Sequence, residues 1–204
     1  RIGLDDAVHL HDLMEGWPVG LQLAAAAIES APDLHATIGQ LNARGGDLRR
    51  FFFESLISRL PLEESAFLVR ISILEAVNRE LCEAVTGCPE SGNYLRRLVD
   101  ESPVVTEGED RDWLRLHAMA RDFLLGQFDR LAAEDRRGCY ERAAAWYADQ
   151  GQHQEAARHA LAAGDESLAV AHVSQCLLDI AREGRLADAH EWIKRLPASA
   201  MARD

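Results

Sequence analysis

The apolar pattern changes in the middle of the stretch Asp112-Trp113-Leu114-Arg115-Leu116-His117-Ala118-Met119-Ala120-Arg121-Asp122-Phe123-Leu124. Trp113, Leu114 and Leu116 suit a short edge strand. Further on, apolar residues recur at the spacing of an amphipathic helix, and these residues are Leu116, Ala120, Phe123, Leu124 and Leu131. The stretch therefore predicts a strand that turns directly into a helix, with His117 at the junction.

A histidine at a helix start has two interpretations. The first turn of a helix carries unpaired backbone N–H groups and the positive end of the dipole, so it favours anions. An imidazole placed there can add one more donor to a phosphate. In the other interpretation, His117 is only a helix-start residue that covers the edge of the sheet.

Three short helices are predicted before this junction, over residues 62–74, 79–86 and 91–101. The β-signal Val104-Val105-Thr106, a polar turn over 107–111 and the strand over 113–116 follow them. Three helices followed by a hairpin is the element order of a winged helix. Earlier in the chain, helices are predicted over residues 5–14, 18–30, 33–42 and 47–60.

After Asp135 the pattern becomes one of paired helices, predicted over residues 135–150, 152–163, 165–182 and 186–196. Gly151-Gln152-His153-Gln154-Glu155-Ala156 is similar to Gly184-Arg185-Leu186-Ala187-Asp188-Ala189, and the offset of 184 − 151 = 33 residues is close to the ~34-residue period of tetratricopeptide (TPR) repeats. Two such repeats bury little surface by themselves. We therefore expect the array to continue past this segment.

A second informative stretch is Glu15-Gly16-Trp17-Pro18-Val19-Gly20-Leu21-Gln22-Leu23-Ala24-Ala25. It reads as a glycine break, a proline in the first helical turn and then an apolar helix. Proline is suited to that turn because its fixed φ is helical and the missing N–H would be unpaired there.

Together with residues 67–74, 80–87 and 143–147, these stretches resemble, in the same order, the large ATP-binding LuxR-type transcriptional regulators (LAL family, MalT-like). Those proteins are STAND class ATPases. The resemblance runs from about Leu4 to Pro197 and implies a mainly α fold. It implies a helical lid over 1–46, a winged helix with a small β-hairpin over 47–130, and the start of antiparallel helix pairs of TPR-like superhelical type over 131–204.

The resemblance also implies a nucleotide site. In that family the proline stretch of the lid lies near the nucleotide base, and a winged-helix histidine touches the phosphates of ADP. The matching positions here are Gly16, Pro18, Val19 and His117. Ala118 departs from the pattern of many eukaryotic relatives, in which an acid follows the histidine. Arg115 and Arg121 are interpreted as surface ion-pair residues rather than phosphate ligands.

The implied function is that of an internal regulatory segment of an ATP-dependent LuxR-family transcriptional activator, which couples nucleotide state to inducer sensing and self-association. ATP or ADP would be held in the full-length protein, together with an upstream P-loop core, and not by this segment alone. An inducer or partner protein would bind the downstream helical array. Two alternatives stay open: a stand-alone TPR-like protein-interaction adaptor without nucleotide binding, and a winged-helix DNA binder.

The charge of the chain argues against a winged-helix DNA binder. The 204 residues include 34 Asp and Glu against 22 Lys and Arg, a formal net charge of −12. The stretch Asp100–Asp112 holds six acidic residues and a single basic one, Arg111. If this stretch forms the wing, it would repel a phosphate backbone, whereas DNA-binding domains carry a basic face. We expect no direct nucleic acid contact.

No catalytic or metal site is predicted. The chain has neither the G-x-x-x-x-G-K-[ST] loop that cradles phosphates nor a G-x-S-x-G nucleophile turn. His9 and His11 would lie on different sides of a helix. No C-x-x-C pair occurs among the cysteines, which are Cys82, Cys88, Cys139 and Cys176. The expectation is therefore a segment that is not an enzyme.

The location of the protein is predicted from what the ends and the apolar runs contain. The chain begins with Arg1 rather than Met, which suggests an excised segment. It has no signal peptide and no apolar run of the roughly 20 residues that a membrane helix needs. The expectation is a bacterial cytoplasmic protein that makes no membrane contact.

Overall fold

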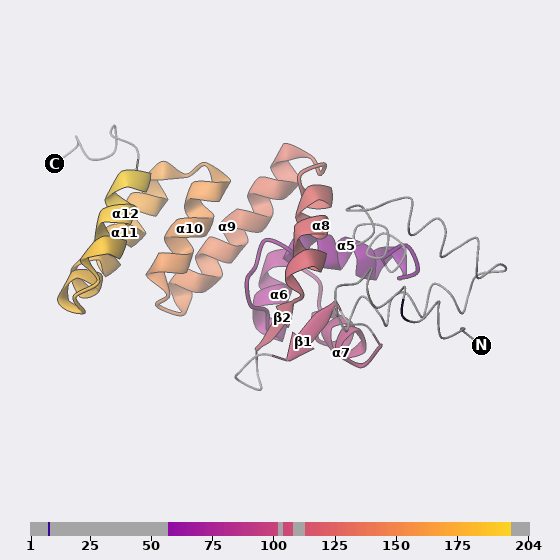
Figure 1. Ribbon diagram of the computed structural model, residues 1–204. Coiled ribbons are helices and arrows are strands. Elements are labelled where there is room, and N and C mark those ends of the chain that lie inside the picture. The colour runs from indigo at the N-terminus through magenta and orange to yellow at the C-terminus, as the bar shows by residue number, and fades with distance from the viewer. Residues whose placement is uncertain (1–7, 9–56, 102–103, 108–112, 197–204) are drawn as a thin grey trace.

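The computed structural model describes residue 8 and residues 57–101, 104–107 and 113–196 (Figure 1). Val8 is helical. Apart from it, the helices predicted over 5–14, 18–30 and 33–42 lie outside the described residues, as does nearly all of the one predicted over 47–60. The boundary of the lid at residue 46 is therefore still a prediction.

The described chain begins with the predicted winged-helix order. The helices α5 (Leu62–Ile71), α6 (Arg79–Thr86) and α7 (Ser91–Glu101) come first, followed by strands β1 (Val105–Glu107) and β2 (Leu114–Leu116) and then helix α8 (Ala118–Phe128). The helix bounds 79–86 and 91–101 agree with the prediction. The first strand lies one residue later than the predicted 104–106, and α8 ends before Leu131.

Strand β2 lies between two partners and is not the edge strand that its sequence suggests. It pairs antiparallel with β1, so that Val105 lies opposite Leu116. On its other side, Val77 and Leu114 exchange two backbone hydrogen bonds, both of 2.8 Å. Val77 is fully buried but pairs as a single residue. The alternating pattern that marks a strand is therefore missing around it.

Helix α5 ends at Ile71, three residues before the predicted end. Ser72 is its C-cap residue, and Ile73 and Leu74 are buried without being helical. These two side chains continue the apolar pattern of α5 because they enter the same core from the loop. Helix α6 is better marked, because the Asn78 side chain accepts a 2.8 Å hydrogen bond from Leu81 N and Gly87 ends the helix with a φ of 68°.

Four further helices form two antiparallel pairs: α9 (Ala133–Asp149) with α10 (His153–Ala163), and α11 (Glu166–Arg182) with α12 (Leu186–Arg195). The first helix begins two residues before the predicted Asp135. In Figure 1 the pairs lie side by side and lead away from the winged helix.

The two pairs repeat with the spacing of 33 residues predicted from the sequence. Helices α9 and α11 start 166 − 133 = 33 residues apart, and α10 and α12 start 186 − 153 = 33 apart. The turn inside each pair also repeats. Gly151 and Gly184 have positive φ angles of 71° and 78°, and the next residue in each case donates to a carbonyl five residues back, at 2.8 and 3.1 Å. The repeat is therefore structural, and its assignment to the TPR type stays a prediction.

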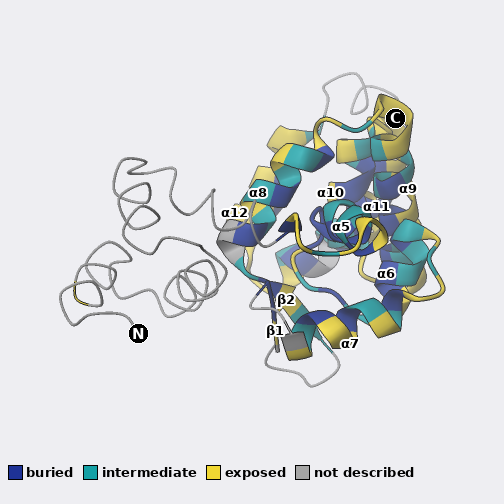
Figure 2. Cartoon of the chain, turned by 90° about the vertical axis from the view of Figure 1, so that its right-hand side faces the viewer, coloured by how far each residue is buried: buried dark blue, intermediate teal, exposed yellow. Residues whose placement is uncertain are grey.

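The main core is shared by the winged helix and the first helix pair. Buried residues gather where α5, α6, α8 and α9 meet (Figure 2). The same cluster includes Leu81 and Leu124 of the winged helix and Ala143, Tyr147 and Ala156 of the pair. A smaller cluster fills the second pair. The core thus continues across residue 130, where the domain boundary was predicted, and that boundary stays a prediction.

A row of aromatic rings follows the same path. Trp113 beside β2 packs edge-on against Trp146, with ring centroids 6.2 Å apart, and Trp146 packs against Tyr147 at 5.3 Å. Tyr147 stacks on His159 of α10 at 5.3 Å and an angle of 8°. Burial lowers the pKa of His159 to about 4, because the charged imidazole loses its hydration there.

Arg121 anchors the first turn of α8. Its Nε donates to the carbonyl oxygens of Ser72 and Leu74, at 3.0 and 3.1 Å. The interpretation of Arg121 as a surface ion-pair residue did not include this contact, in which Nε serves the backbone of the loop after α5. No motif marks such a contact, since its partners are carbonyl groups and lie 49 and 47 residues away in the chain.

We expect the free energy of unfolding to fall as the pH falls from about 6.5 to about 4, because the unfolded chain protonates His159 more readily than the folded one. The pKa difference corresponds to roughly 3 kcal/mol at the lower end. Denaturant titrations at several pH values should show a smaller pH slope for His159→Gln. Retention of the wild-type slope would contradict the prediction, and His190→Gln controls for loss of an exposed imidazole.

Arg121→Met should lower the free energy of unfolding by about 1–3 kcal/mol, because two loop carbonyls lose their donor. Arg115→Met is the matched control. It removes the same charge from an exposed position of β2, and we expect a change below about 0.5 kcal/mol. Equal effects of the two changes, measured by denaturant unfolding, would show that Arg121 is not an anchor.

Candidate functional site

His117 is the N-cap residue of α8, with φ of −55° and ψ of 131°. Its backbone N–H donates to the carbonyl of Val104 at 2.8 Å, and its own carbonyl accepts from Arg121 N at 2.9 Å. The backbone is therefore held on both sides, by the segment that leads into β1 and by the first turn of α8. The predicted strand-to-helix junction with a histidine on it is confirmed.

The His117 side chain is half-buried. Burial lowers its pKa, so the neutral imidazole is favoured at neutral pH. A neutral imidazole has one donor and one acceptor nitrogen. In this state His117 can offer one N–H to an anion at the start of α8, where the helix dipole also favours negative charge.

Of the four residues predicted to contact nucleotide, the structure describes only His117. Gly16, Pro18 and Val19 lie outside the described residues. Their role as nucleotide contacts, and that of His117, therefore stays a prediction. Among the described residues, no group of three or more His, Cys, Asp or Glu side chains could hold a metal ion.

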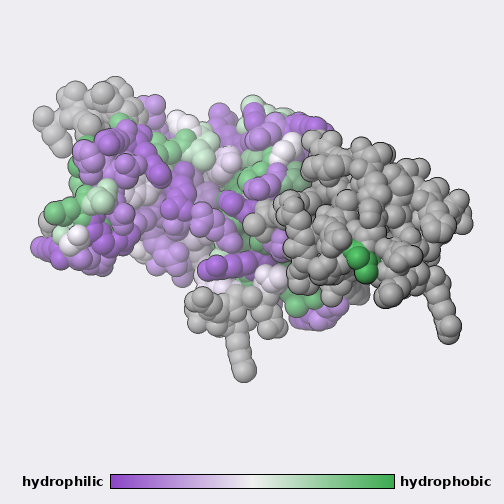
Figure 3. Space-filling model, viewed as in Figure 1, coloured by the Kyte–Doolittle hydropathy of each residue, from purple (hydrophilic) through white to green (hydrophobic). Residues whose placement is uncertain are grey.

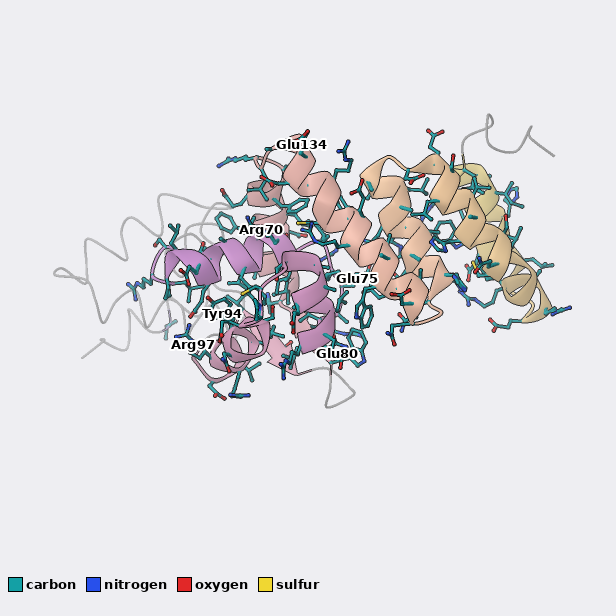
Figure 4. The ribbon with its side chains drawn as sticks, turned by 180° about the vertical axis from the view of Figure 1, so that it is seen from behind. Arg70, Glu75, Glu80, Tyr94, Arg97 and Glu134 are labelled. Atoms are coloured by element: carbon teal, nitrogen blue, oxygen red, sulfur yellow. The ribbon has the colours of Figure 1, made fainter. Side chains whose placement is uncertain are left out.

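The junction is linked to the first helix pair by polar contacts as well as by the core. Arg142 of α9 donates from Nε to the carbonyl of Val85, in the last turn of α6, at 2.7 Å. Arg158 Nη1 of α10 lies 3.2 Å from a carboxylate oxygen of Glu75, in the loop that Arg121 anchors, and 3.1 Å from one of Glu155. Glu75 is labelled in Figure 4. The contacts of Arg142 with Val85 and of Arg158 with Glu75 have no sequence signal, because each joins residues at least 57 positions apart.

Helix α7 carries two consecutive arginines, Arg96 and Arg97. Part of its polar face contacts acidic residues of α5. The Tyr94 hydroxyl donates to Glu63 at 3.1 Å, and Arg97 pairs with the buried carboxylate of Glu64. Both acids belong to α5, and Tyr94 and Arg97 are labelled in Figure 4. These two side chains are therefore held by α5 rather than offered to a phosphate backbone.

The described helices also bear on membrane association. None of them is both long and apolar enough to cross a bilayer.

The chain matches a known family over the winged helix. Residues 53–136 match the family described as "MalT winged helix domain". This range contains every element from α5 to α8 and the first turn of α9.

Similarity to whole proteins extends over nearly the full chain. It is 28% identical over 200 residues to the serine/threonine-protein kinase PknK of Mycobacterium tuberculosis (strain ATCC 25618 / H37Rv), covering 98% of this chain and 18% of that protein. It is 26% identical over 194 residues to the HTH-type transcriptional regulator AlkS of Pseudomonas putida, covering 94% and 21%. The HTH-type transcriptional regulator MalT of Serratia proteamaculans (strain 568) is 27% identical over 197 residues, covering 94% and 22%.

The chain thus spans about a fifth of the length of these curated relatives. The resemblance to MalT-like regulators that the sequence stretches suggested is confirmed, and it is not confined to the winged helix. The order of helices and hairpin in residues 53–136 agrees with the match of this range to the MalT winged helix domain family.

Proposed function

We propose that this chain is the internal regulatory segment of an ATP-dependent LuxR-family transcriptional activator of the bacterial cytoplasm, in which it couples nucleotide state to inducer sensing and self-association. The names of its relatives support a switching role. AlkS and MalT are HTH-type regulators, whereas PknK is a kinase. A segment found in proteins with such different outputs fits a position between sensing and output.

The nucleotide side of the switch would be the surface around His117. ADP would lie between an upstream P-loop core, the lid residues Gly16, Pro18 and Val19, and the imidazole at the start of α8. A ligand shifts a two-state balance only by its difference in affinity for the two states. His117 would supply such a difference if it donates to phosphate only in the closed state.

The observation that carries the proposal is the shared core of the winged helix and the first helix pair. Tyr147 and Ala156 belong to the same buried cluster as Leu81 and Leu124. Arg142 and Arg158 add two polar contacts across the same interface. A displacement of α8 by nucleotide would therefore move α9 and α10 as well, which would carry the signal into the helical array.

The exposed face of α12 supports an array that continues in the same chain, which would carry the site for an inducer or partner protein. Leu186 and Ile193 are 66% and 39% exposed. The residues 33 positions earlier in α10 are His153 and Ala160, and Ala160 is fully buried in a cluster with Ala169 of α11. In Figure 3 this end of the molecule shows apolar side chains among hydrophilic ones. A further helix on α12 would cover them as α11 covers α10.

We expect the 204-residue chain to show no saturable binding to a mixed-sequence DNA duplex at physiological ionic strength. Its net charge of −12 is unfavourable, since phosphate contacts dominate such affinity. Fluorescence anisotropy with a labelled duplex measures this directly. A complex that weakens steeply as salt is added would contradict the prediction and favour the winged-helix DNA binder.

In the full-length protein, His117→Ala should weaken ADP binding and raise inducer-independent activity. One donor to a charged phosphate contributes about 1.5–3 kcal/mol, which is enough to move an appreciable fraction of molecules out of a closed state favoured by only a few kcal/mol. ADP affinity and basal transcription should be measured together, with His117→Asn as the variant that keeps a donor.

Two results would count against this proposal. Unchanged ADP affinity in a well-folded His117→Ala protein would leave His117 as a structural residue that covers the sheet edge. A full-length protein that binds neither ATP nor ADP would favour the helical adaptor instead.

A further inference from the structure

A cavity of about 470 Å³ lies where the end of α8, the first turns of α9 and the end of α10 meet. It lies at the opposite end of α8 from His117. The 11 residues of that helix separate the two places by roughly 16 Å. Its volume falls in the range of about 300–1,000 Å³ that is typical of small-molecule sites. It is therefore separate from the proposed nucleotide surface.

The second helix pair shows why the first one leaves this space open. Ala162 and Ala163 line the cavity from the last turn of α10. The residue 33 positions after Ala163 is Leu196, which packs against the buried clusters of the second pair. At the corresponding end of the first pair the chain has only a methyl group, so the space that a leucine would help to fill remains.

The wall formed by α9 departs from the repeat as well. Arg136 and Tyr140 line the cavity, whereas the residues 33 positions later are Ala169 and Val173, which are buried in the second pair. The first pair thus carries a guanidinium and a phenol where the second has small apolar side chains. Both departures, on α9 and on α10, concern residues that line the same cavity.

One nitrogen of the Arg136 side chain lacks a hydrogen-bond acceptor among the described residues. Arg136 Nε is buried and has no hydrogen-bond partner among the described residues. Its Nη1 lies 3.9 Å from a carboxylate oxygen of Asp129, a distance beyond hydrogen-bond length, and Asp129 is 72% exposed. A buried N–H without an acceptor is unfavourable. The Arg136 side chain is 36% exposed, so its guanidinium is open to an acceptor oxygen from a ligand in the cavity.

We propose that this cavity binds a small organic monoanion, a carboxylate carried on an aromatic or aliphatic body. The carboxylate would accept from the guanidinium of Arg136, and the body would lie against the half-buried ring of Tyr140. That ring packs edge to face on the fully buried Phe128, at 5.5 Å and 83°. The charged lining residues are Asp129, Glu134, Arg136 and Arg137. Their formal charges cancel, which favours a single negative charge over a polyphosphate.

The test uses benzoate as the probe and benzyl alcohol as its neutral counterpart, titrated into the 204-residue chain and followed by protein-observed NMR. We expect saturable benzoate binding with shifts at residues of the cavity and clearly weaker binding of benzyl alcohol. Arg136→Met should weaken benzoate binding by about tenfold or more. The matched control is Arg130→Met, which removes an exposed arginine that does not line the cavity.

Ala163→Leu tests the cavity independently of charge, because it introduces the side chain that the second pair has 33 residues later. It should abolish benzoate binding while the unfolding midpoint stays the same or rises. Absence of saturable binding to the wild-type chain would overturn the proposal, and so would unchanged affinity in Arg136→Met. If Ala163→Leu does not fold, Arg136→Met alone decides the matter.

Discussion

The packing of α9 against α6 is the contact on which the rest of this structure depends. Ala143 is fully buried there, and a small side chain at such a position lets two helices approach closely. Arg142, the neighbouring residue, donates to the carbonyl of Val85 at the end of α6, where a cation is also favoured by the helix dipole. Together with the Trp113–Trp146 packing and the Arg158–Glu75 ion pair, this contact joins the winged helix that carries His117 to the helical pairs.

Some helix ends could be predicted because they carry a local signal. Asn78 and Gly87 mark the two ends of α6, and Gly151 and Gly184 mark the turns of the repeat with a conformation that favours glycine. Where such signals are missing, the bounds are less accurate. Ile73 and Leu74 extend the apolar pattern of α5 into a loop, because burial selects apolar residues whether or not the backbone is helical.

The surroundings of His117 could be predicted only in part. The strand-to-helix junction follows from the local pattern, whereas Val77, Arg121 and Arg158 reach it from elements far away in the chain. A pattern of spacing describes one element at a time, so it cannot show which carbonyl an arginine will reach. The same limit applies to Arg136, whose role depends on a space formed by three helices.

Because the two helix pairs repeat, residues 33 positions apart can be compared to see which side chains the packing of a pair requires. Positions that serve only the core should be filled alike in both copies, as Ala156 and Ala189 are, both of them buried. Arg136 and Tyr140 on α9 and Ala163 on α10 differ from their counterparts in the second pair. All three line the cavity, whereas the counterpart of Ala163, Leu196, packs against the core of the second pair. Other buried positions also differ between the copies, as Tyr147 and Ile180 do, so a difference alone does not indicate a ligand. Arg136, Tyr140 and Ala163 stand apart from those positions because all three line one cavity, and this is why the ligand is proposed there.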